Sequence, residues 1–236
     1  MKIFLPLFLI ILLTGCATVK TGPVGRFSLL PETTPVHMQD LTPMDMAYLD
    51  KSQFLVQMEA AKGKEKGGKR IGLIFTTETM RQQPISITSI NLKSWLVKGL
   101  KTIGYFLERT NAQTQVVILV EYGVEEINNP TYVQQFHKKI YNRYLNLRAL
   151  NYSAYRDSKR QKVLWEVRLS SLGPESNMNK ILPVLSALVP EAINQQVTQT
   201  LLVSPRDPRL EMTKEVPTAI SVEEFKPTVE ELKVFN

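Results

Sequence analysis

Residues 140–170 read IYNRYLNLRALNYSAYRDSKRQKVLWEVRLS, and this stretch decides the fold. From Ile140 onward the side chains alternate between two faces, which is the period of a β-strand. The polar turn RDSKR at 156–160 separates this strand from a second alternating run, VLWEVRL at 163–169. The stretch therefore predicts an antiparallel hairpin, with strands at 140–155 and 163–169.

Shorter elements precede and follow the hairpin. Short apolar runs rich in β-formers predict strands at 70–77, 105–108 and 115–125. Apolar side chains at helical spacing predict helices at 42–61, 89–103 and 178–197, the last with Pro183 and Pro190 in it. From residue 70 onward the order β-α-β-β-β-β-α predicts an α+β fold, in which two or three helices pack on one face of an antiparallel sheet.

The hairpin also supplies a candidate core residue, Trp165. Its alternate neighbours along the strand are apolar, so that face of the sheet needs a cover. The helix at 89–103 offers Trp95 and Leu100 on its apolar side. We therefore expect Trp165 to be buried against this helix.

The first 15 residues have the pattern of a cleaved signal peptide. Lys2 precedes an apolar run from Ile3 to Leu13, and this run is too short to span a bilayer, which takes about 20 apolar residues. The sequence then reads Leu13-Thr14-Gly15-Cys16, and Cys16 is the only cysteine in the chain. These residues resemble the lipobox of bacterial lipoproteins.

The resemblance implies that a peptidase cuts before Cys16 and that Cys16 carries the lipid. Two or three acyl chains hold a protein firmly at a bilayer, because each buried methylene contributes roughly 0.8 kcal/mol. Ala17 stands where an Asp would retain such a protein at the inner membrane, so the resemblance implies the periplasmic face of the outer membrane. The alternative is an ordinary secreted protein with a stray cysteine.

The composition predicts four segments. They are a signal peptide at 1–15, a lipidated tether at 16–42, one α+β domain at 43–204, and a loosely ordered tail rich in Pro and Glu at 205–236. Removal of residues 1–15 leaves 28 basic and 22 acidic residues, a net charge of +6. A basic body is attracted to an anionic bilayer. We expect no nucleic-acid partner, because the chain is exported and has no recognition motif.

Basic side chains follow the predicted hairpin and could contact anionic lipid headgroups. The candidates are Lys138, Lys139, Arg143, Arg148, Lys159 and Arg160. The run KGKEKGGKR at 62–70 is predicted to be a flexible basic loop that could join them. The alternative interpretation is a solvated sheet edge, whose charges prevent pairing with other edges.

The sequence contains no catalytic or metal-binding signature. One cysteine excludes disulfides within the chain and cysteine-based metal clusters, and His37 and His137 have no partner at ligand spacing. No nucleophile elbow or phosphate-binding loop occurs, so we expect no cofactor and no enzyme activity. The alternative is a hydrolase of an envelope polymer, with an active site that the sequence does not reveal.

Several segments resemble the DUF4136 family of small bacterial lipoproteins. They are Leu100 to Tyr105, Val116 to Val120, Leu147 to Leu150 and Val163 to Trp165, followed by the closing helix. The family has no established catalytic residues to carry over. Together with the lipobox, the resemblance implies a binding or assembly module of the cell envelope, whose partner is an anionic lipid surface or another envelope protein.

Overall fold

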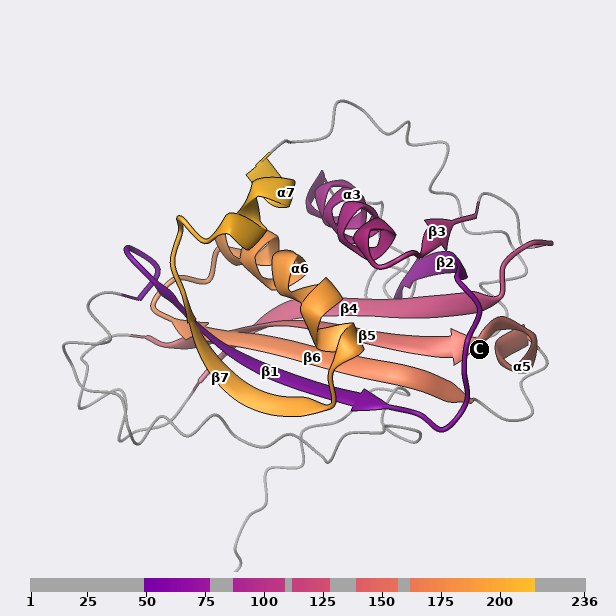
Figure 1. The fold of residues 1–236 in the computed structure, drawn as a ribbon. Coiled ribbons are helices and arrows are strands. Elements are labelled where there is room, and N and C mark those ends of the chain that lie inside the picture. Colours follow the sequence, from indigo (N-terminus) through magenta and orange to yellow (C-terminus); the bar gives the residue numbers. More distant parts are fainter. Residues whose placement is uncertain (1–48, 77–86, 109–111, 128–138, 157–161, 215–236) are drawn as a thin grey trace, which may run out of the picture.

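The computed structural model describes residues 49–76, 87–108, 112–127, 139–156 and 162–214. These residues form an α+β fold, with one seven-stranded sheet and the two longest helices over one of its faces (Figure 1). The strands are β1 (Phe54–Lys62), β2 (Arg70–Phe75), β3 (Phe106–Leu107), β4 (Val116–Glu126), β5 (Tyr141–Asn151), β6 (Val163–Gly173) and β7 (Val197–Val203).

The strand order across the sheet is β3-β2-β4-β5-β6-β1-β7. From β4 to β7 all neighbours are antiparallel, and β5 and β6 form the expected hairpin pair. However, β2 runs parallel to both β3 and β4, so the sheet is mixed and the prediction of an antiparallel sheet is wrong. The reason is the crossover through a helix between β2 and β4, because such a connection joins parallel strands.

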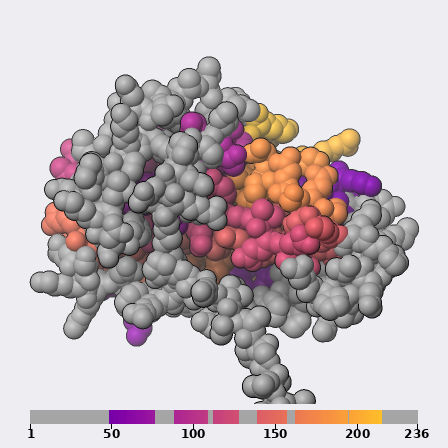
Figure 2. All heavy atoms as spheres, turned by 180° about the vertical axis from the view of Figure 1, so that it is seen from behind, coloured from indigo at the N-terminus to yellow at the C-terminus, as the bar shows by residue number. Residues whose placement is uncertain are grey.

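The helices are α3 (Ile87–Thr102), α5 (Tyr152–Arg156), α6 (Met178–Asn194) and α7 (Glu211–Lys214), with a 3₁₀ turn η3 at Pro208–Leu210. α3 agrees with the predicted amphipathic helix. Asn177 caps the N-terminus of α6, and its side chain accepts a hydrogen bond from the backbone N–H of Asn179. α3 and α6 pack against each other. In the space-filling view from behind, the magenta atoms of α3 lie beside the orange atoms of α6 (Figure 2).

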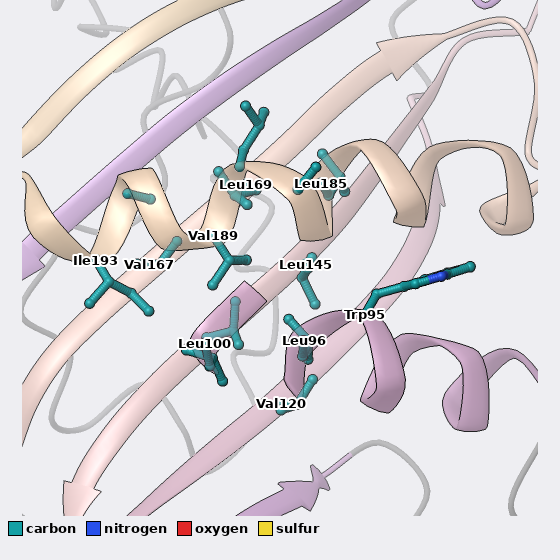
Figure 3. Close-up of a cluster of buried hydrophobic side chains, with 14 of the residues drawn as sticks. Trp95, Leu96, Leu100, Val120, Leu145, Val167, Leu169, Leu185, Val189 and Ile193 are labelled. Carbon is teal, nitrogen blue, oxygen red and sulfur yellow. The ribbon is translucent and has the colours of Figure 1, made fainter. Parts of the chain in front are cut away.

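The core fills the space between these two helices and the sheet, whose covered side we call the helix face. Side chains of α3 and α6 point toward those of the central strands (Figure 3). Trp165 is buried, as predicted, and its Nε1 donates a hydrogen bond to the Tyr105 hydroxyl at 3.1 Å. Tyr105 follows the end of α3, so this bond joins β6 to the helix layer.

The predicted helix at 42–61 is wrong where the structure describes it, because residues 54–62 form β1. β1 lies between β6 and β7 and pairs with both. Its side chains alternate, so Val56, Met58 and Ala60 face the core. Met, Glu and Ala favour helices in isolation, but pairing on both sides and burial outweigh that preference.

Three other predicted boundaries need correction. The strand predicted at 140–155 ends at Asn151, where α5 follows, and the helix predicted to residue 197 ends at Asn194, where β7 soon begins. The predicted tail from residue 205 is structured up to Lys214: Leu210 and Thr213 are buried, and α7 packs on α3 and α6. The folded body therefore extends ten residues beyond the predicted boundary.

Candidate functional site

Many of the predicted site residues lie outside the described part of the chain. These are Cys16, Lys138, Lys159 and Arg160. The predictions made for them stay predictions. His37 and His137, for which no role is predicted, lie outside the described part as well.

Arg143 is a buried structural residue, so its prediction as a contact for an anionic surface is wrong. Its side chain is 0% exposed, and Nη1 lies 2.7 Å from Oδ2 of Asp50. Nη2 donates a second hydrogen bond to Oγ of Ser171 at 3.1 Å. The cause is strand alternation, because Arg143 shares the helix face with Leu145.

Arg148 is also buried, but on the opposite side of the sheet, which we call the far face. Its side chain is 4% exposed, and Nη2 lies 3.0 Å from Oε1 of Glu166, its direct neighbour in the β5–β6 register. Arg168 approaches the same carboxylate oxygen at 3.2 Å. The prediction for Arg148 is therefore wrong, because its charge is held by an internal ion pair.

Lys139 is exposed, and its Nζ lies 3.1 Å from Oε2 of Glu126. This hydrogen bond raises the pKa of Lys139. Lys139 lies where β4 ends and β5 begins, whereas Lys162, before β6, lies at the other end of the hairpin. Strands of 11 residues separate these ends by about 36 Å. Of the predicted hairpin cations that the structure describes, Lys139 alone is exposed, so these three form no single surface, and neither β5 nor β6 is an edge strand.

The structure instead brings cations from several segments together at one end of the sheet. We call this group the basic end; its members are Lys62, Lys64, Lys66, Lys69, Arg70, Lys101 and Lys162, all exposed. They come from the end of β1, the turn into β2, the last turn of α3 and the start of β6. In Figure 1 this is the end of the sheet beside β2, β3 and α5.

The turn that carries most of these cations is held in place by backbone contacts. The Gly63 N–H donates to the Leu164 carbonyl at 2.8 Å. At Gly63 a Cβ would lie 2.2 Å from the Val163 carbonyl oxygen, so only glycine allows this approach. The side-chain oxygen of Gln115 accepts from the backbone N–H of Lys69 at 3.2 Å. The basic run is therefore fixed at both ends, rather than the flexible loop that the sequence predicts.

The basic end carries a net positive charge. Glu65 lies 2.8 Å from Lys162, and Glu108 lies 3.6 Å from Arg70. Among the described residues no carboxylate lies within 4.0 Å of the other five cations. Seven cations and two carboxylates give a net charge of +5. This arrangement can attract an anionic surface.

Two aromatic side chains, Tyr105 and Phe106, adjoin the basic end. The Lys69 Nζ lies 4.0 Å from the centroid of the Tyr105 ring and donates to the Ile103 carbonyl at 3.3 Å. Phe106 pairs with Arg70 in the β2–β3 register, and it is 57% exposed. Sequence reasoning missed Phe106, because strand periodicity alone does not identify which strand lies at the sheet edge.

No group of three or more His, Cys, Asp or Glu residues in the described part of the chain is placed to hold a metal ion. No helix in that part combines the length and the apolar character needed to cross a bilayer.

Comparisons with known proteins add little. No protein-family model matches the chain, and no curated protein matches it either. Among solved structures, the chain is similar to a PDZ domain protein from Parabacteroides distasonis ATCC 8503, with 11% sequence identity and a TM-score of 0.43. The similarity covers 69% of this chain and 43% of that protein, so the chain spans less than half the length of this structural neighbour. The resemblance to the DUF4136 family stays a prediction.

Proposed function

We propose that this chain is a lipid-anchored module of the bacterial cell envelope, attached through Cys16 to the periplasmic face of the outer membrane. It acts as a non-enzymatic binding or assembly protein, and its basic end contacts anionic lipid headgroups. The observation that carries the proposal is the gathering of seven exposed cations from four segments beside the exposed Phe106. The lipobox at Leu13 to Cys16 supports the anchor.

The energies are adequate for a supporting contact. A basic residue near an anionic surface contributes about 1 kcal/mol, so the five lysines with no carboxylate neighbour among the described residues contribute on the order of 5 kcal/mol at low salt. Burial of a phenylalanine side chain adds roughly 1.5 to 3 kcal/mol. Salt weakens the first contribution, because the Debye length is about 8 Å at physiological ionic strength.

The segment between Cys16 and the described body is long enough for this contact. The described body begins at Leu49, beside the Asp50–Arg143 pair, at the end of the sheet opposite to the basic end. Residues 17–48 can span at most about 110 Å, whereas β5 is about 36 Å long. A body anchored through Cys16 can therefore turn its basic end to the same bilayer.

A flotation experiment tests the proposal. The chain from residue 16 onward, carrying Cys16→Ser so that it stays in solution, is mixed with vesicles of phosphatidylglycerol or of phosphatidylcholine. We expect binding to phosphatidylglycerol alone, with loss of binding at high salt. The variant K64E/K66E/K69E should lose this binding.

The matched control places the same charge change at the other end of the sheet. Lys51, Lys139 and Lys180 lie there and are exposed. The variant K51E/K139E/K180E should keep most of the binding. Equal losses in the two triple variants would show that only net charge matters and would remove the basic end from the proposal.

A further inference from the structure

The two edges of the sheet are very different. One edge is β3, which has two residues, and the other is β7, which has seven. At about 3.4 Å per residue, β7 presents an edge of roughly 24 Å. Among the described residues β7 pairs with β1 alone, in an unbroken antiparallel register from Val197 to Val203. Figure 1 shows β7 as the outermost strand on its side of the sheet.

β7 lacks the features that usually protect an edge. Natural edge strands are protected by charged side chains, by proline, by bulges or by short length. The sequence of β7, VTQTLLV, contains no charged residue and no proline, and its register with β1 shows no shift. Thr198, Thr200 and Leu202 are exposed, and Leu202 is 62% exposed. As far as the described part of the chain goes, the edge is therefore regular, uncharged and accessible.

We propose that β7 binds an extended segment of a second protein by strand addition. In an antiparallel pair, alternate residues direct their N–H and C=O groups away from the neighbouring strand, so the outward groups of β7 can form a second ladder. On the helix face, Val197 and Leu201 are partly buried against the core. A partner strand of about seven uncharged residues would extend that core with apolar side chains at alternate positions.

A second copy of this chain is a poorer occupant. Two identical edges related by a two-fold axis normal to the sheet pair antiparallel, so the two bodies point in opposite directions. Their basic ends would then lie on opposite sides of the dimer, and only one could face the bilayer. The choice of a different protein, instead of a second copy, as the partner therefore rests on the proposed function.

Hydrogen exchange tests the inference on the full-length protein in neutral detergent micelles. The probe is the acetylated and amidated heptapeptide TVTVTVT at millimolar concentration, and the control is the peptide TVPVPVT, which cannot form a continuous ladder. Mass spectrometry follows amide exchange in the segment 197–203. We expect exchange there to slow at least ten-fold with the first peptide and to stay unchanged with the second.

Matched variants identify the edge as the binding site. The variant T200K/L202K places charge on exposed positions of β7, so it should keep the fold and lose the protection. Val124 is also an exposed apolar residue, 41% exposed, but it lies on β4 inside the sheet, so Val124→Lys should keep the protection. Vesicle binding of T200K/L202K should equal that of the wild type, which separates this inference from the basic end.

Three outcomes would overturn the inference. The first is that the peptide TVTVTVT slows exchange equally in T200K/L202K and in the wild type. The second is that millimolar TVTVTVT does not slow exchange at all. The third is that the wild type sediments as a homodimer and T200K/L202K as a monomer. The last outcome would identify a second copy as the occupant of β7.

Discussion

Arg143 and Asp50 form a buried ion pair that joins three segments of the chain. The Arg143 guanidinium donates to Asp50 Oδ2 at 2.7 Å, and the backbone N–H of Glu175 donates to the same oxygen at 3.3 Å. Asp50 precedes β1, Arg143 is on β5, and Glu175 follows β6. Asp50 also has a φ of 63°, a left-handed conformation that is uncommon for residues other than glycine. The carboxylate therefore holds the start of the body against the end of the hairpin.

We expect Arg143→Gln to reduce the free energy of unfolding by about 3 to 5 kcal/mol. Removing one partner of a buried pair leaves the other charge without compensation. Urea denaturation measures the loss. Arg206 is exposed on the turn after β7, so Arg206→Gln should cost less than about 0.5 kcal/mol. Similar midpoints for the two variants would show that the buried pair contributes little.

Trp165→Ala should cost about 3 to 5 kcal/mol, since it leaves a large cavity in the core. Trp165→Phe keeps most of the volume and removes the hydrogen bond to Tyr105, so its cost should be clearly smaller. Thermal unfolding of the two variants gives the comparison. A shift of only a degree or two for Trp165→Ala would contradict the core described here.

The stability of the protein should fall at alkaline pH partly because of Tyr105. Burial raises the pKa of Tyr105 above its ordinary value, although the hydrogen bond from Trp165 opposes the shift. The unfolded chain then loses the phenolic proton at a lower pH than the folded protein does. This stabilising contribution is complete below about pH 10, the unfolded pKa, and is lost as the pH rises through the folded value. Denaturation of wild type and Tyr105→Phe at pH 8 to 11 should show a difference in stability that shrinks only above pH 10.

Cys16→Ser should leave an unprocessed precursor without lipid. The proposed lipid modification alkylates the sulfur of this thiol with diacylglycerol, and in lipoproteins the cut depends on that modification. Labelling of cells with a fatty-acid analogue measures incorporation. Wild-type labelling of the variant would remove the lipid anchor from the proposed function.

Residues 205–214 should contribute to stability although they follow the last strand. Leu210 is buried, and Arg209 lies 2.6 Å from Glu191 of α6. A chain that ends after Ser204 loses both, so it should be less stable by about 3 kcal/mol than a chain that ends after Lys214. Thermal melting of the two truncated chains gives the difference. Equal melting temperatures would restore the boundary that the composition predicts.

Local periodicity predicted the parts of the fold that depend on local pattern. The helix at 89–103 and the hairpin of β5 and β6 both have an apolar face with the correct period, and both are present. The local pattern of β1 predicts a helix, because its partners in the sheet are more than 100 residues away and leave no local signal. The parallel pairing of β2 could have been predicted, since the order strand, helix, strand implies a crossover.

The placement of the charged residues depends on the tertiary structure. Arg143 stands on the apolar side of its strand, and that position was a signal of burial, but nothing local identifies Asp50 as its partner. The basic end combines a visible run at 62–70 with Lys101 and Lys162, which only the tertiary structure brings near. A cluster assembled from distant segments cannot be predicted from the spacing of its members.

The position of β1 also determines when the body can fold. β1 is the first described strand, yet its neighbours β6 and β7 are the last two. Phe54 pairs with Val203, 149 positions later, and Lys62 pairs with Trp165, 103 positions later. Such long loops must close before their contacts give any stability, so folding is slow. During synthesis the N-terminus of the chain emerges first, so β1 stays unpaired until β6 and β7 have been made. The sheet is then completed in one late step.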